Sequence, residues 1–218
     1  MSELRKVYTT VDARDRIVEA ALTVFSNLGF DGATTREIAK EAGVSSALIH
    51  HHFQDKETLW KLVGSRISEE FVEAMTASTA PALKGTTEGL RKIVAAYMGY
   101  WRQHPRALRF QLWRVLGAPR EERKARSESL NKMFVPAFEE AQKAGQLRQD
   151  VPAGLLMITL GGLVQYFLHS DVETNDALAV TGAPPLEDEK ALDYLMSLIA
   201  TTPASPAATD KKRRATKK

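Results

Sequence analysis

Apolar residues recur at helical spacing along most of the chain, and no segment alternates apolar and polar residues as a half-buried strand does. A first helix is predicted between a suitable N-cap at Asp12 and a stop at Gly29, since glycine tolerates the positive φ of a helix end. One face of this helix carries Ile17, Ala20, Ala21, Val24, Phe25 and Leu28. The pattern predicts an all-α fold.

Two short helices are predicted to follow. Thr34 and Glu37 have the spacing of a capping box, which opens a helix that Gly43 ends. Ser45 is then a suitable N-cap for a second short helix that ends near Phe53. Three helices therefore fill this first part of the chain.

A longer amphipathic helix is predicted from its N-cap at Asp55 to about Met75, which is roughly 30 Å and long enough to connect two modules. Residues 174–185 are expected to form a loop, and residues 202–218 a disordered tail rich in Pro, Ala, Thr and Lys. Further helices are expected at 87–103, 105–116, 121–144, 152–170 and 187–200.

Composition narrows the class of protein. The 218 residues include no cysteine, which excludes disulfides, thiolate metal sites and cysteine nucleophiles. The N-terminus lacks the apolar segment of a signal peptide, and the most apolar stretch, 155–168, is shorter than the roughly 20 residues that span a bilayer. We therefore expect a cytoplasmic protein that does not contact a membrane.

The net charge of +3 is unevenly distributed. Residues 209–218 carry six Lys or Arg and one Asp, a net charge of +5, which leaves −2 for the rest of the chain. Binding to nucleic acid must therefore depend on where individual cations lie. The tail either strengthens DNA binding without adding sequence specificity, or is a solvated segment that does not contact DNA.

Residues 34–53 have the build of a helix-turn-helix, whose second helix enters the major groove of DNA. Leu48 is placed to contact a thymine methyl group, and other outward side chains are short or planar enough to approach base edges. These outward residues are Ser46, Ala47, His50 and His51. The alternative is a helical hairpin inside an ordinary bundle, where such side chains have no function.

Three residues near helix starts are further candidates for DNA contacts. Ser45 and Lys56 lie where exposed amides and the positive end of the helix dipole favour a phosphate. Arg36 can reach a guanine or a phosphate, or can form only a surface ion pair. For Lys56 the alternative is a solvated surface lysine.

The run from Ile17 to Trp60 resembles the DNA-binding domain of the tetracycline-repressor (TetR) family. The matching segments are AALxxF (20–25), GF (29–30), TTREIA (34–39), AGVS (42–45) and HFxxKExL (52–59). At His50, family members usually carry a tyrosine that binds phosphate. The resemblance implies that DNA lies along Thr35, Arg36, Ser46, Ala47, Leu48, His50, His51, His52 and Lys56.

The second half of the chain is rich in aromatic residues, each of which either packs the core or lines an apolar cavity. The family resemblance implies a cavity that binds a small-molecule effector. The candidate ligand-binding residues are Tyr97, Tyr100, Trp101, Phe110, Trp113, Phe134 and Phe138.

The helix at 152–170 is apolar on nearly all faces and must therefore be covered all round. The resemblance implies that it pairs with the helix at 187–200 across a two-fold axis, as a four-helix bundle. The candidate interface residues are Leu156, Leu160, Leu163, Val164, Phe167, Leu192, Leu195, Met196 and Ile199. The alternative is a monomeric core.

No catalytic residue and no metal site are expected. The chain has no G-x-S-x-G, P-loop, HExxH or paired-carboxylate pattern, and none of its five histidines has a histidine partner at i+4. We therefore expect no enzymatic activity and no cofactor. An enzyme and a pure interaction protein remain the alternatives, and specific binding of one duplex would exclude both.

The sequence thus predicts a homodimeric transcriptional regulator of palindromic double-stranded operator DNA, with a repressor released by a small-molecule effector as the favoured form over an activator. The predicted parts are an N-terminal arm at 1–11, a helix-turn-helix domain at 12–60, a ligand-sensing and dimerisation domain at 61–201 and a basic tail at 202–218.

Overall fold

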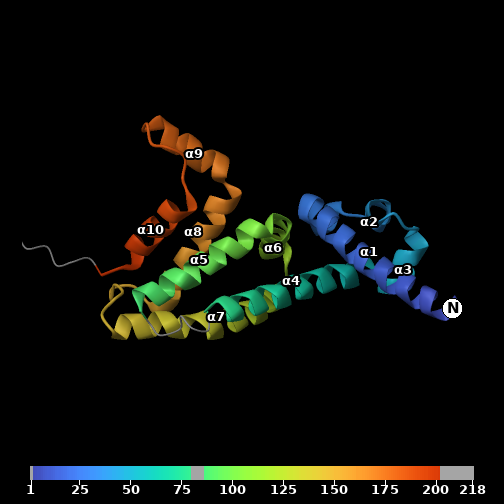
Figure 1. Ribbon diagram of the computed structural model, residues 1–218, viewed down its shortest axis with the longest axis horizontal. Helices are drawn as coiled ribbons and strands as arrows, with labels where there is room; N and C mark the ends of the chain where they lie inside the picture. The colour runs from blue at the N-terminus through green and yellow to red at the C-terminus, as the bar shows by residue number, and fades with distance from the viewer. Residues whose placement is uncertain (1, 80–85, 202–218) are drawn as a thin grey trace, which may run out of the picture.

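The computed structural model describes residues 2–79 and 86–201, and within these ranges the chain is folded into α-helices without a strand. This confirms the all-α prediction. The predicted basic tail lies outside the described residues. Three helices gather at one end of the elongated molecule and six form the other end, with one long helix running between them (Figure 1).

The three-helix end, here called the head, consists of α1 (Ser2–Gly32), α2 (Thr35–Ala42) and α3 (Ser46–Phe53). The prediction that Asp12 caps the first helix is wrong, because α1 begins at Ser2 and continues through that position. The predicted stop is confirmed, since Gly29 breaks the helical backbone with φ 70° and ψ −173°. The buried apolar residues of the head are continuous with the core of the body and include Ile17, Ala21, Phe25, Ile38, Ile49 and Phe53.

The connecting helix α4 (Lys56–Thr79) reaches from the head into the body, which is the name used here for the remaining six helices. The body comprises α5 (Thr87–Gln103), α6 (Pro105–Gly117), α7 (Arg120–Lys143), α8 (Ala153–His169), α9 (Asp171–Val180) and α10 (Asp188–Ile199). Five of these six agree closely with the predicted helices. The exception is α9, because its residues 174–180 fall in the segment expected to be a loop.

Helix α9 projects away from the rest of the body (Figure 1). None of its residues is buried, and Val172 and Val180 are both highly exposed. A helix that buries no apolar stripe lacks the periodic pattern by which the sequence identifies a helix. That absence explains why the loop prediction failed there.

The head and the body meet through α6, which packs against both α1 and α4. Phe110 is fully buried, with its ring centroid 4.3 Å from that of Trp60 and 6.2 Å from that of Phe25. Beside this cluster, the indole of Trp113 donates a 3.2 Å hydrogen bond to the carbonyl of Ser26. The junction is therefore a packed interface and not a flexible linker.

Candidate DNA-binding surface and ligand cavity

Four helix caps fix the reading unit of the head. Thr34 and Glu37 form the predicted capping box, in which each residue accepts a hydrogen bond from the other's backbone amide. Gly43 ends α2 with φ 65°, and the hydroxyl of Ser45 accepts from Leu48 N to start α3. Asp55 caps α4 in the same way, by accepting a 2.7 Å hydrogen bond from Thr58 N. These four predicted caps are confirmed, unlike the cap predicted at Asp12.

The outer side of α3 carries the residues predicted to read DNA. Ala47, His50 and His51 are exposed, whereas Leu48 is half-buried against the core of the head. His50 Nδ1 lies 3.1 Å from the carbonyl oxygen of Gln54, so this ring is already oriented by the end of its own helix. The remaining predicted positions are also solvent-accessible to some degree: Thr35, Arg36, Ser45, Ser46 and His52.

Lys56 has partners inside the head that the sequence did not reveal. Its Nζ donates hydrogen bonds to the carbonyl oxygens of Phe30 at 2.7 Å and Ala33 at 2.9 Å, and lies 4.3 Å from the Phe30 ring centroid. The ammonium thus joins the start of α4 to the end of α1. The Lys56 side chain is half-buried, and two of its three N–H donors are used in these hydrogen bonds, so one donor remains for a phosphate. A contact between Lys56 and DNA stays a prediction.

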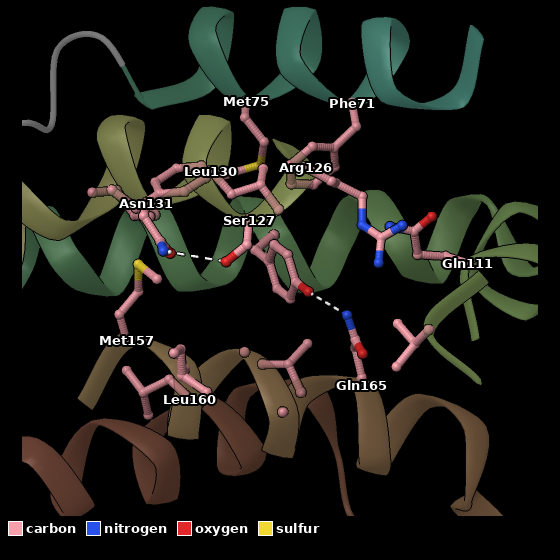
Figure 2. Close-up of a pocket in the computed structure, with 18 of the residues that line it drawn as sticks. Phe71, Met75, Gln111, Arg126, Ser127, Leu130, Asn131, Met157, Leu160 and Gln165 are labelled. Atoms are coloured by element: carbon pink, nitrogen blue, oxygen red, sulfur yellow. Dashed lines mark hydrogen bonds between the residues drawn. The ribbon is translucent and has the colours of Figure 1, made fainter. Parts of the chain in front are cut away.

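The body contains a cavity of about 790 Å³, bounded by α4, α5, α6, α7 and α8. This volume lies within the range of about 300 to 1,000 Å³ that small-molecule sites have. Figure 2 shows Phe71 and Met75 entering it from α4, Leu130 from α7 and Leu160 from α8. Its interior is therefore largely apolar.

Three of the seven predicted ligand-binding aromatics line this cavity: Tyr97, Phe134 and Phe138. The hydroxyl of Tyr97 accepts a 2.7 Å hydrogen bond from Gln165 Nε2 (Figure 2), and burial raises the pKa of this phenol. Asn131 and Ser127 form a second polar contact in the lining, in which Asn131 Nδ2 donates a 3.2 Å hydrogen bond to Ser127 Oγ (Figure 2).

The other four predicted aromatics lie outside the cavity lining, because other contacts occupy them. Phe110 and Trp113 belong to the junction with the head. Trp101 stacks on Phe71 with ring centroids 5.3 Å apart, and Tyr100 stacks on His104 at 4.3 Å. Phe110, Tyr100 and Trp101 are buried in the core, whereas Trp113 is 41% exposed and contacts the head.

One side of the cavity is cationic, which the sequence analysis did not identify. The first two turns of α7 contribute Arg120, Arg123, Lys124 and Arg126 to the lining. Among the described residues, no carboxylate side chain lines the cavity at all. The signal in the sequence was the charged segment REERKAR at 120–126, but such a segment also fits an ordinary solvated helix face.

A buried arginine joins three helices next to the cavity. Arg114 Nη1 donates to the carbonyl oxygen of Gly64 at 3.2 Å, and Nη2 donates to Glu122 Oε1 at 2.8 Å. A Cβ at Gly64 would lie 2.9 Å from the guanidinium carbon, so a larger residue at this position would require the Arg114 side chain to shift. Arg114 on α6 thereby holds α4 against the start of α7.

Most of the predicted dimer-interface residues are buried inside the single chain, where the body's own helices cover them. These are Leu156, Leu160, Val164, Leu192, Leu195, Met196 and Ile199. Leu163 and Phe167 are only partly buried. The strongly exposed apolar side chains of α8 and α10 are instead Leu155, Ile158, Tyr166 and Tyr194.

Within the described ranges, no helix by itself has the length and apolar character needed to cross a bilayer. The bent pair α8 and α9, whose axes differ by 87°, meets that criterion only when the two are joined.

A capped helix-turn-helix with an exposed second helix, attached to a helical body that contains a cavity, is the architecture typical of helix-turn-helix DNA-binding proteins. Residues 17–63 match the family model of bacterial regulatory proteins of the tetR family, and residues 90–191 match that of the tetracyclin repressor-like C-terminal domain. The chain belongs to the TetR family of bacterial regulators.

Individual relatives are moderately similar. The HTH-type transcriptional regulator YttP of Bacillus subtilis is 33% identical over 101 residues, which cover 46% of this chain and 49% of YttP. The alignment thus spans about half the length of that relative. The HTH-type transcriptional repressor NicS of Pseudomonas putida is 28% identical over 166 residues, or 74% of this chain and 77% of NicS.

Solved structures share the fold at lower sequence identity. A TetR family transcription regulator from Marinobacter aquaeolei is 22% identical with a TM-score of 0.67, over 88% of this chain and 97% of that one. AibR, in complex with isovaleryl coenzyme A and operator DNA, is 20% identical with a TM-score of 0.66, over 87% of this chain and 98% of that one.

Proposed function

We propose that the protein is a homodimeric repressor that acts in the cytoplasm, binds a palindromic operator through α2 and α3, and releases it when a small molecule enters the cavity of the body. The observation that carries the proposal is the pairing of an exposed recognition helix with a separate cavity, linked by α4 and α6. AibR, which has the same fold, binds both an acyl coenzyme A and operator DNA.

The exposed residues of α3 support reading of the major groove. Ala47 and His51 leave room for close approach to base edges, and Ser45 and Arg36 flank them at helix starts where phosphates bind well. Phosphate contacts would fix the position of the head on the duplex, whereas side chains on the outward face of α3 would determine which DNA sequence is bound.

A second copy of the chain is the proposed cover for the exposed apolar side chains of α8 and α10. Phe167 and Tyr194 lie on one face, with ring centroids 6.5 Å apart, and Tyr166 is exposed on the same helix as Phe167. Two heads related by a two-fold axis would meet successive major grooves roughly 34 Å apart. Tyr194→Asp should therefore shift the protein from dimer to monomer in analytical ultracentrifugation without unfolding it.

The route from cavity to head runs through contacts that join the two. Phe71 and Met75 of the cavity wall lie on α4, the helix that Lys56 ties to α1. Arg114 joins α4 to α7, and its neighbour Trp113 contacts Ser26 in the head. A ligand that displaces α7 or α4 would thus change the position of the head, and a shift of a few ångströms would cost contacts in both half-sites.

The test of this function is selection of bound sequences from a random duplex library, using the full chain. A palindromic consensus with half-sites about one helical turn apart supports the proposal. Enrichment of no sequence, or of a site without two-fold symmetry, would contradict it.

A further inference from the structure

The cavity has an apolar interior and a cationic side. The apolar part is formed from α4, α5, α7 and α8, and includes Phe71, Met75, Phe134 and Leu160. The cationic side is formed by the first two turns of α7 with Arg120, Arg123, Lys124 and Arg126. Since no Asp or Glu of the described residues lines the cavity, its wall holds these four positive charges without an opposing carboxylate.

Arg126 is the least compensated of the four cations. Its Nη1 is buried without a hydrogen-bond partner, and Figure 2 shows its guanidinium beside the side chain of Gln111, an uncharged residue. Burial, together with the positive charge of Arg114, lowers the pKa of Arg126. The nearby carboxylate of Glu122 acts in the opposite direction, but its Oε1 already accepts a 2.8 Å hydrogen bond from Arg114.

The other three cations are exposed and nearly free of ion pairs. Among the described residues, Lys124 has one loose contact, 3.9 Å from Glu128, and neither Arg120 nor Arg123 forms an ion pair. A partly buried guanidinium without a partner is unfavourable, whereas a carboxylate or phosphate can bind it through two parallel hydrogen bonds. The side of the cavity formed by α7 is therefore built to receive negative charge.

We infer that the cavity binds an anionic amphiphile, with a hydrocarbon body against the apolar wall and a carboxylate or phosphate against Arg126 and Arg123. This inference rests on the proposed function, since it names the class of effector for the same cavity. A neutral apolar ligand would leave Arg126 unpartnered, and a cationic ligand would be repelled by all four charges. The volume of about 790 Å³ holds a medium-length acyl chain.

The test is isothermal titration calorimetry of the full chain, without DNA, using four ten-carbon probes. Decanoate presents a carboxylate, decanoyl coenzyme A presents phosphates, 1-decanol is neutral and decyltrimethylammonium is cationic. At least one anionic probe should bind about tenfold or more tightly than decanol, and the cation should bind most weakly. Preference for decanoate over decanoyl coenzyme A, or the reverse, identifies the anionic group that the site accepts.

A variant locates the anion site. Arg126→Gln should weaken binding of the preferred anion about tenfold and leave the affinity for decanol unchanged. The matched control is Arg109→Gln, because Arg109 is exposed on α6 and does not line the cavity. Without ligand, Arg126→Gln should raise the melting temperature, since it removes an uncompensated charge, whereas an arginine with a purely structural role would lower it on removal.

Three results would overturn the inference: no probe binds, decanol binds as tightly as both anions, or Arg126→Gln leaves anion affinity unchanged. Duplex binding measured with the same probes separates this inference from the proposed function. If an anion binds through Arg126 but does not release the selected duplex, the ligand class stands and the regulatory role fails. If a neutral probe releases the duplex and the anions do not, the regulatory role stands and the ligand class fails.

Discussion

The head and the body are both helical, but different kinds of contact hold them together. In the head, the capping partners Thr34 and Glu37 are three residues apart, as are Ser45 and Leu48. In the body, Arg114 reaches a carbonyl oxygen 50 residues earlier in the chain, and five helices surround a cavity. The head is thus specified by local chemistry, and the body by the packing of distant segments.

This difference suits two different tasks. A surface that reads DNA must present one fixed shape, and short-range caps around a small core supply it. A body that senses a ligand must keep space for it, and a ligand in the cavity adds packing contacts with the cavity wall. Ligand binding should therefore stabilise the body by mass action, while the head gains nothing directly.

The largest expected effect comes from a negative charge on the reading surface. Ala47→Glu places a carboxylate on the exposed face of α3 and toward phosphates in both half-sites, which should cost about 4 kcal/mol, or roughly a thousandfold in duplex affinity. The measurement is fluorescence anisotropy with the selected duplex. Ala144→Glu, at an exposed position at the far end of α7, is the matched control and should bind normally. Equal losses in the two variants would show that charge alone, and not its location, weakens binding.

Next in size is the junction between the two regions. Gly29→Ala introduces a Cβ at positive φ and 3.0 Å from the Trp113 ring, which should destabilise the protein by about 3 kcal/mol in urea unfolding. Gly43→Ala lies in the left-handed helical region (φ 65°, ψ 37°) with no atom within 4 Å, so only backbone strain of about 1 kcal/mol is expected. At Gly29 the extended ψ of −173° adds further backbone strain to the contact with Trp113. If the two losses are equal, the head does not depend on the contact with α6.

Removal of the Arg114 contacts should destabilise the protein less than Gly29→Ala does, but it should weaken the coupling between probe binding and duplex binding. Arg114→Gln loses the hydrogen bonds to Gly64 and Glu122, which should cost about 2 kcal/mol in urea unfolding. Probe binding and duplex binding should each survive, whereas the effect of the probe on duplex affinity should shrink. A variant in which that effect is unchanged would exclude Arg114 from the route between the two regions.

The smallest expected effects are on the pH dependence of stability. The two regions differ in whether the acid or the alkaline side of the stability curve is affected. At the start of α4, next to the head, hydrogen bonds from Thr58 lower the pKa of Asp55 below 3.8, so its contribution is present above that pH and is lost as the pH falls through the lowered value. Asp55→Asn should therefore flatten the acid side of the stability curve. An acid side as steep as that of the wild type would mean that Asp55 does not contribute.

In the body, burial raises the pKa of Tyr100 from 10.0 to about 12. Its neutral form supports the fold fully below pH 10, and that contribution is lost as the pH rises from 10 to about 12. Tyr100→Phe should therefore flatten the alkaline side of the stability curve, measured by urea unfolding at a series of pH values. If the alkaline side is as steep in Tyr100→Phe as in the wild type, other groups cause the loss of stability at high pH.

The same division explains what the sequence could predict. The caps at Thr34, Gly43, Ser45 and Asp55 depend on residues within one helical turn, so their pattern is visible in the sequence alone. The N-cap prediction at Asp12 was wrong, because a cap residue also has to follow a non-helical segment, and here α1 extends back to Ser2.

The cavity was less predictable, because its lining depends on how distant helices pack. Phe110 and Phe134 are both aromatic residues on helices of the body, yet one lies in the junction and the other in the cavity wall. Arg126 and Gln165 were overlooked, since polar residues on a helix usually face solvent. Lys56 was recognised as important, but its bonds to carbonyl groups of α1 follow only from the tertiary structure.

Coupling between the head and the body can be measured as the affinity of the preferred anionic probe for the free protein and for its complex with the selected duplex. Thermodynamic reciprocity requires the duplex to weaken probe binding by the same factor by which the probe weakens duplex binding, and we expect that factor to be about 5 to 150. Equal probe affinities for the free protein and the complex would exclude this coupling, because a ligand that does not distinguish the two states cannot release the DNA.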